Sequence, residues 1–479
     1  MAATDPPTII QGGMGVAIST WRLARAVARR GQLGTVSGTA LAVVLARRLQ
    51  CGDPGGSMRR ALAHLPLPGI AQRVLARWYV PGGIAGDVPF RAVPRPTVTP
   101  RSALVELTLA ANFAEVFLAK EDHDGPVAVN HLHKVRPLTP AALYGALLAG
   151  VDYVAMGAGI PRDIPALLDA LATHAAVTQR IPLVGGETGD AVTAGFDPRA
   201  LWARAGAEPP HALRRPHFLA IVASATLAQA LAREPATRPD GFVIEGPMAG
   251  GHNAPPRGRL RLDDDGQPRY GPRDVVDPAA VARLGLPFWL GGGYGGRDGL
   301  ARARAAGATG VQVGTLFSLC AESGMAEPLK DALLARARAG GIAVRTDPAA
   351  SPTGFPFKIA VVPGTLSEPQ VRDARARVCD LGYLSEPYRR PDRTIGYRCA
   401  AEPTGDYVRK GGAAADTSGR VCLCNALTAT AGYPQRRSGG ATEPAVVTAG
   451  DGLVAAAALL GGDRRRYSAD DVLDHLLAA

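Results

Sequence analysis

The sequence predicts an α/β fold, a (β/α)8 barrel with long loop insertions and a cysteine-containing C-terminal extension. Short apolar runs without alternation recur along the chain; each ends near glycines, and a helical pattern follows most of them. Parallel strands that are buried on both faces have this pattern. Eight such units favour a closed barrel over an open doubly wound sheet, which stays the alternative.

We expect the eight strands at residues 8–10, 33–37, 126–130, 151–156, 218–223 and 242–245 and around Phe288 and Val311. The first helix should span residues 21–30, with Ser19 or Thr20 as its N-cap and Gly31 just past its end. The first three elements therefore form a βαβ unit.

Two insertions interrupt the alternation of strands and helices, and a C-terminal extension follows it. Residues 39–125, with helical patterns at 43–49, 58–65 and 104–120, follow the second strand, and residues 183–216 follow the fourth. Both should emerge at the ligand end of the barrel and form a lid or substrate region. We therefore expect a barrel domain over residues 1–344 and a C-terminal extension over residues 345–479.

The charge balance points to biased composition more than to a nucleic-acid partner. The 479 residues carry a formal charge of +11, but only five of the 53 basic residues are lysine, and the arginines are scattered. No basic tract with interleaved aromatic residues occurs, so we expect no nucleic-acid binding. No leader pattern and no run of 18 apolar residues occur, which predicts a cytoplasmic protein that does not enter a membrane.

Residues 241–252 are the stretch around which the chain is organised. A short apolar run ends in Glu245 and a glycine-rich turn, and His252 follows two glycines. A buried strand delivers a side chain into a site in this way. Because imidazole titrates near neutrality, we interpret His252 as the catalytic residue, while an ordinary surface-loop histidine is the alternative.

Two later stretches repeat the pattern of an apolar run followed by a glycine turn. Residues 287–293 end in three glycines, and residues 310–315 end in Gly314 and Thr315. Adjacent strand ends with bare backbone N–H groups make a cradle for a phosphate. In a (β/α)8 barrel the phosphate commonly lies on the loops after strands seven and eight, where these two turns fall.

On these motifs the sequence resembles the nitronate monooxygenase (2-nitropropane dioxygenase) family. Its relatives include flavin-dependent enoyl-acyl-carrier-protein reductases and the trans-acting enoyl reductases of polyketide and polyunsaturated fatty-acid synthases. The resemblance covers about residues 7–339. Its most specific piece is the stretch from Glu245 to His252, and the opening residues 9–14 and both glycine turns match in order.

The resemblance implies a TIM barrel that binds FMN at its C-terminal mouth. Residues of the flavin site would be Gly13 and Met14 through their backbone, Asn130 from the third strand, and Glu245, Gly250 and Gly251 on one wall, with Gly292, Gly293, Gly314 and Thr315 at the phosphate. Where relatives often carry a lysine on the fifth strand, this chain has Ser224.

The resemblance leaves two reactions open. The first is oxidation of alkyl nitronates with oxygen, in which His252 sits against the nitro compound. The alternative is an NAD(P)H-dependent enoyl reductase that acts on substrates bound to acyl carrier protein in fatty-acid or polyketide synthesis. A protein that has lost catalysis and only binds is disfavoured, because His252 and both phosphate turns are present.

The extension carries four of the six cysteines, Cys379, Cys399, Cys422 and Cys424. Four thiolates hold zinc or an iron–sulfur cluster in many proteins, but the spacing is not the regular C-x2-C pairing. We therefore expect separate small hydrophobic side chains more than a metal site; a metal site would clip the extension onto itself, remote from the flavin. His123, His131 and His133 match no standard zinc pattern and are read as ordinary loop histidines.

Overall fold

Eight parallel strands form the central sheet of the computed structural model, which describes residues 6–187, 189–437, 440–461 and 464–478. Around the sheet the order is β1-β11-β10-β8-β7-β4-β3-β2. The strands are β1 (Ile9–Gln11), β2 (Gly34–Ser37), β3 (Val127–Leu132), β4 (Tyr153–Gly157), β7 (His217–Val222), β8 (Gly241–Glu245), β10 (Phe288–Gly291) and β11 (Gly310–Val313). A parallel bridge between Ile10 and Leu33 joins the two ends. The (β/α)8 barrel and all eight predicted strands are confirmed.

The barrel interior is a small apolar core of its own. Ile10, Ala128, Leu219, Val243 and Trp289 pack together inside it and are almost fully buried. A second, larger core lies between the strands and the surrounding helices. Burial on both faces explains why the strands read as apolar runs without alternation.

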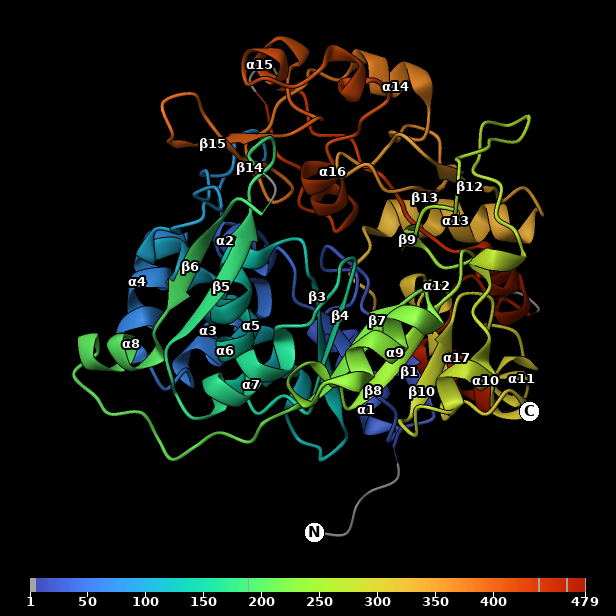
Figure 1. The fold of residues 1–479 in the computed structure, drawn as a ribbon, viewed down its shortest axis with the longest axis horizontal. Helices are drawn as coiled ribbons and strands as arrows, with labels where there is room; N and C mark the ends of the chain where they lie inside the picture. Colours follow the sequence, from blue (N-terminus) through green and yellow to red (C-terminus); the bar gives the residue numbers. More distant parts are fainter. Residues whose placement is uncertain (1–5, 188, 438–439, 462–463, 479) are drawn as a thin grey trace.

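Helices surround the sheet in chain order (Figure 1). Those that follow barrel strands are α1 (Trp21–Arg29), α5 (Ser102–Lys120), α6 (Thr139–Leu148), α7 (Ile164–Ala172), α9 (Ala225–Arg233), α10 (Pro278–Ala282), α11 (Gly299–Ala305) and α12 (Thr315–Ser318); α13 (Glu327–Arg338) follows α12. Thr20 is at the N-cap position of α1, but neither its hydroxyl nor that of Ser19 caps the helix. The Trp21 amide donates instead to the Glu115 carboxylate at 2.9 Å.

The first insertion is shorter than the sequence suggests. Helix α5 packs between α1 and α6 as the barrel helix that joins β2 to β3. The excursion thus ends near residue 101 and comprises α2 (Leu41–Gln50), α3 (Ser57–Ala63) and α4 (Pro68–Trp78), which pack on the outside of α5. The sequence did not predict α4, because Pro68 and Gly69 at its start read as a turn, although proline suits the first helical position.

By length and composition alone, α5 is apolar enough to cross a membrane, and it is the one such helix among the described residues. However, 72% of its apolar window is buried. Its neighbours are α1, α2, α3, α4 and α6. This burial is typical of a core helix in a barrel wall.

The second insertion is a hairpin that reaches the extension. Strands β5 (Val177–Pro182) and β6 (Ala191–Phe196) pair in antiparallel fashion, and α8 (Pro198–Arg204) follows. The Val184 amide donates to the Pro387 carbonyl at 2.9 Å, and Arg389 forms an ion pair with Asp190 at 2.8 Å. The hairpin therefore supports the extension from the side.

Most of the C-terminal extension lies above the barrel, as its orange and red segments show in Figure 1. It contains β12 (Val344–Asp347), β13 (Phe357–Ala360), α14 (Pro369–Ala374), β14 (Glu386–Arg389), β15 (Ile395–Arg398), α15 (Thr404–Arg409) and α16 (Leu423–Thr430). Strand β13 pairs with β12 and with β9 (Gly251–His252), which follows β8. A small sheet, with β9 from the barrel and β12 and β13 from the extension, thus joins the two parts.

The last helix, α17 (Ala469–Leu477), returns to the barrel wall. It packs against α1, α11 and α12. Arg30, directly after α1, forms ion pairs with Asp470 and Asp474, and the Tyr467 hydroxyl donates to the Leu316 carbonyl at 2.7 Å. The chain's end therefore completes the helix layer beside α1, where α12 is too short to do so.

Candidate functional site

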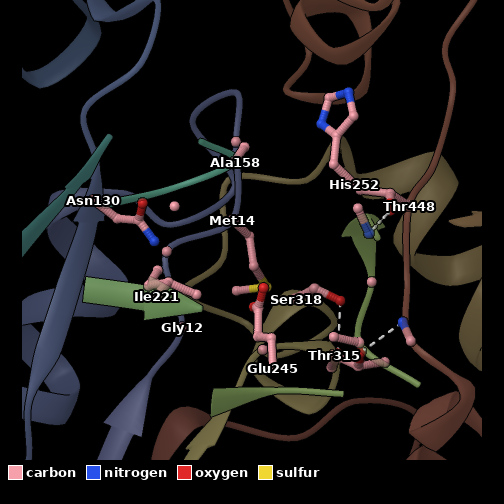
Figure 2. Close-up of a pocket in the computed structure, with 18 of the residues that line it drawn as sticks. Gly12, Met14, Asn130, Ala158, Ile221, Glu245, His252, Thr315, Ser318 and Thr448 are labelled. Carbon is pink, nitrogen blue, oxygen red and sulfur yellow. Dashed lines mark hydrogen bonds between the residues drawn. The ribbon is translucent and has the colours of Figure 1, made fainter. Parts of the chain in front are cut away.

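A pocket of about 260 Å³ opens at the carboxyl ends of the barrel strands. Every residue that the sequence analysis names as catalytic or cofactor-binding lines it: Gly13, Met14, Asn130, Glu245, Gly250, Gly251, His252, Gly292, Gly293, Gly314 and Thr315. Figure 2 shows several of them converging from different strands. Because parallel strands end at one rim of a barrel, glycine turns that are far apart in sequence meet here.

The turn after β1 is held in place by hydrogen bonds to the Ser19 side chain. The Ser19 hydroxyl accepts from the Met14 amide at 2.9 Å and donates to the Gly12 carbonyl at 3.0 Å. A Cβ on Gly13 would lie 2.3 Å from the Asn130 side chain, so only glycine fits at this point. The close approach leaves the Asn130 amide directed into the pocket (Figure 2).

The two glycine turns after β10 and β11 present free backbone donors. The amides of Gly292, Gly293 and Gly314 donate to no acceptor among the described residues. Gly292 and Gly293 have φ angles of 83° and 87°, which L side chains rarely adopt. The Thr315 hydroxyl accepts from the Gly450 amide at 2.9 Å, so the extension closes this side of the pocket. Free amides on adjacent turns suit an anionic group.

His252 stands where the barrel meets the extension. Its Nε2 lies 2.7 Å from the Ser351 hydroxyl oxygen, and its ring meets the edge of Phe357 at 4.9 Å between centroids. Figure 2 shows the imidazole at the far end of the pocket from Glu245. Burial, and then the nearby charge of Lys134, lower the pKa of His252 to about 3. The imidazole is therefore neutral at physiological pH and can accept a proton.

Lys134 is an unpaired cation close to this histidine. Its Nζ is shielded from water, has no hydrogen-bond partner among the described residues and lies 3.4 Å from the centroid of the Phe355 ring. Burial lowers the pKa of Lys134 to about 8, against the opposing effect of Glu386. A buried charge without a hydrogen bond is costly, and groups of this kind gather at functional sites.

Glu245 lies on the floor of the pocket. Its carboxylate has one weak neighbour, the Gln312 side-chain amide at 3.4 Å, and burial raises the pKa of Glu245 to about 7. This carboxyl is thus poised to change protonation near neutral pH. The opposite ends of the pocket hold a neutral base and a titratable acid.

Sequence reasoning missed several lining residues. His131 was read as an ordinary loop histidine, but it lines the pocket, its Nε2 has no partner among the described residues, and burial lowers its pKa to about 4. Its position directly after the predicted strand 126–130, next to Asn130, could have indicated that it lies in the site. Others come from the extension, including Phe357, Tyr383, Leu384, Leu423, Cys424, Leu427, Thr448, Ala449 and Gly450. No local pattern indicates that such residues return to the barrel mouth.

The insertions contribute little to this pocket. Of residues 39–125 only Thr39 and Ala40 line it, and no described residue of the second insertion does. The extension forms the wall that we expected the insertions to form. Ser224, at the position where relatives often have a lysine, caps α9 by accepting from the Leu227 amide at 3.3 Å.

The four cysteines of the extension come together. Cys399 and Cys422 pack with Ala401 in a buried cluster, and Cys379 and Cys424 pack against it. Among the described residues, no group of three or more histidine, cysteine or acidic side chains is placed to hold a metal ion. Cys424 also lines the pocket. The cluster therefore adjoins the pocket.

Comparison with known families agrees with the motifs. Residues 169–348 match the family model of nitronate monooxygenase. This confirms the resemblance and identifies a nitronate monooxygenase domain in that part of the chain. The matched domain is that of a family of flavin-dependent oxidoreductases. A search of curated proteins returned no match.

Solved structures align with this chain at low identity. FabK from Thermotoga maritima is 16% identical, with 99% of this chain and 92% of that chain covered and a TM-score of 0.50. A nitroalkane oxidase from Streptomyces ansochromogenes is 17% identical (99% and 95% covered, TM-score 0.44), and the enoyl reductase domain of MlnA from Bacillus amyloliquefaciens is 12% identical (98% and 94% covered, TM-score 0.46). The first of these supports the barrel fold.

Proposed function

We propose that the chain is an FMN-dependent oxidoreductase that oxidises alkyl nitronates with oxygen, and that His252 can form the nitronate by taking the α-proton of a neutral nitroalkane. One observation carries this proposal: every flavin-site residue expected from the sequence lines a single pocket, together with a neutral imidazole. The match to the nitronate monooxygenase family supports it independently.

The residues present fit a flavin mononucleotide. The free amides of Gly292, Gly293 and Gly314 would hold one phosphate, with the nearby Thr315. Gly13 keeps backbone and the Asn130 amide close together, which suits polar contacts to a flat ring system. No second dinucleotide fingerprint follows a strand, which favours FMN over FAD. The flavin would supply the redox step, and the protein would supply orientation and electrostatics.

His252 would move the proton. Burial keeps its imidazole neutral, so one ring nitrogen carries a free lone pair that can take the proton from the carbon next to the nitro group of a neutral nitroalkane. The Ser351 hydroxyl fixes the ring through Nε2, which leaves Nδ1 as the second polar atom. Lys134 adds positive charge nearby, which would favour an anionic substrate.

The insertions that were expected to wall a larger pocket stay outside it, apart from Thr39 and Ala40. The expected argument for a long acyl substrate is therefore lost. An enoyl reductase that acts on carrier-bound acyl groups is the second candidate, and no feature of the pocket favours it specifically.

Anaerobic mixing separates the two reactions. The flavin-loaded protein is mixed without oxygen with an alkyl nitronate in one sample and with NADH or NADPH in another, and the flavin absorbance is followed. We expect rapid bleaching by the nitronate and indifference to both nucleotides. Rapid bleaching by a nucleotide, with oxidation of the bleached flavin by an enoyl thioester, would assign the enoyl reductase activity instead.

A further inference from the structure

The C-terminal extension contributes an apolar wall to the pocket that the proposed reaction does not use. Leu384, Cys424 and Leu427 line the pocket, and each of these residues is half-buried. Apolar side chains that stay partly open inside a concave site favour an apolar ligand. We name these three residues the α16 wall, because two of them lie on that helix.

The α16 wall is supported from behind by the core of the extension. Cys424 and Leu427 are three residues apart on α16, so their side chains lie on one face of the helix. Ala426, on the same helix, is fully buried in the core of the extension, and Leu384 and Leu427 pack against that core. The wall is therefore a packed surface.

The α16 wall also carries no charge. Burial raises the pKa of Cys424, so its thiol is protonated at physiological pH and behaves as a small apolar group. Tyr383, next to Leu384, lines the pocket as well, but its hydroxyl oxygen is shielded from water. From the barrel, Leu132 at the end of β3 and Val135 line the same pocket. Apolar side chains from both parts of the molecule thus meet there.

The position of His252 indicates which ligand the wall faces. The Phe357 ring, which meets the His252 ring at 4.9 Å between centroids, belongs to the core that supports the α16 wall. The residues expected at the flavin ring, among them Met14 and Asn130, come from the ends of barrel strands instead. The wall and the residue that acts on the substrate are therefore built on one core, apart from the flavin residues.

We propose that the α16 wall is the subsite for the apolar alkyl group of the substrate, and that it selects nitronates with long unbranched chains over short ones. This inference rests on the proposed function, which places the nitronate carbon beside His252. Each methylene that leaves water and is buried against the wall should raise kcat/KM by up to about fourfold. Polar side chains in the wall should remove this gain.

A chain-length series measures the selection. The flavin-loaded protein is assayed with the nitronates of primary nitroalkanes from nitroethane to 1-nitrooctane. In wild type we expect kcat/KM to rise by about two- to fourfold for each of several added carbons. Leu427→Asn and Cys424→Ser keep the size of the side chain but make the wall polar, and both should flatten this rise. Leu477→Asn is the matched control, because Leu477 is 39% exposed on α17 and does not line the pocket, and it should keep the wild-type slope.

Titration with alcohols makes the test independent of turnover. The series from 1-propanol to 1-octanol, which cannot reduce the flavin, is titrated into the flavin-loaded protein, and the flavin absorbance reports each dissociation constant. If nitronates are not oxidised, but affinity rises with alcohol length in wild type and not in Leu427→Asn, the proposed function fails and the subsite stands. The subsite is overturned if both series are flat in wild type, or if their slopes are the same in Leu427→Asn. It is also overturned if Leu427→Asn loses affinity for FMN, which would place the flavin against the wall.

Discussion

The Nε2 atom of His252 lies 2.7 Å from the hydroxyl oxygen of Ser351, and this contact joins the end of a barrel strand to the C-terminal extension. His252 also pairs with Phe357 through the backbone of the small sheet between them. The extension therefore fixes the imidazole. A histidine that the glycine turn alone would leave mobile is oriented from the opposite side.

The first prediction concerns this contact. His252→Ala should retain the flavin, because the phosphate turns are elsewhere, and should slow turnover of a neutral nitroalkane by at least about 10²-fold, the usual contribution of a general base. Ser351→Ala should cause a smaller loss in kcat, because it removes only the orienting group. Steady-state kinetics with a neutral nitroalkane measures both. Unchanged turnover in His252→Ala would remove this side chain from the mechanism.

Much of the fold was predictable because each barrel strand carries its own signal. The strands that contain Val243 and Trp289 are buried on both faces. Their apolar runs therefore indicate a strand from the local sequence alone. The flavin-site residues share a rim for the same reason, since parallel topology brings strand ends together. The roles of Ser351 and α17 were not predictable, because each depends on contacts with barrel segments about a hundred residues or more away in the chain.

A second prediction tests the return of α17 to the barrel. Leu473 is fully buried on α17, whereas Leu477, on the same helix, is 39% exposed. Leu473→Ala should lower the free energy of unfolding by about 2–5 kcal/mol, the usual range for a buried leucine, and Leu477→Ala by much less. Urea unfolding measures the difference. Equal effects would mean that α17 does not pack into the wall.

The third prediction concerns Glu245 and pH. Its pKa is raised in the folded protein, from 4.5 to about 7, because burial disfavours the carboxylate. Its contribution to stability is therefore fully present below about pH 4.5 and is lost as the pH rises through about 7. The shift corresponds to at most about 3 kcal/mol.

Glu245→Gln isolates this effect. In flavin-free protein, the free energy of unfolding of wild type relative to Glu245→Gln should fall between pH 4.5 and 7. Urea midpoints measured at several pH values give this difference. A constant difference across the range would show that Glu245 titrates normally.

A fourth prediction tests the phosphate turns with a matched pair of glycines. Gly292 and Gly285 both have positive φ, but a Cβ on Gly292 would lie 2.9 Å from the Ala249 amide nitrogen, whereas a Cβ on Gly285 would meet nothing within 4 Å. Both alanine variants place an L side chain at a positive φ, 83° and 68° respectively. Only Gly292→Ala should lose flavin affinity, by tenfold or more, as measured by fluorescence titration of flavin-free protein. Equal flavin affinities of the two variants would mean that the phosphate does not bind at the Gly292 turn.

Identification of the small molecule that the purified protein binds tests the central claim most directly. The purified protein is denatured, and the released small molecule is separated by chromatography and compared with FMN and FAD. The account predicts FMN, close to one per chain, because three free amides on adjacent turns offer room for one phosphate. FAD as the main species, or a protein that releases no flavin and takes up no added FMN, would contradict it.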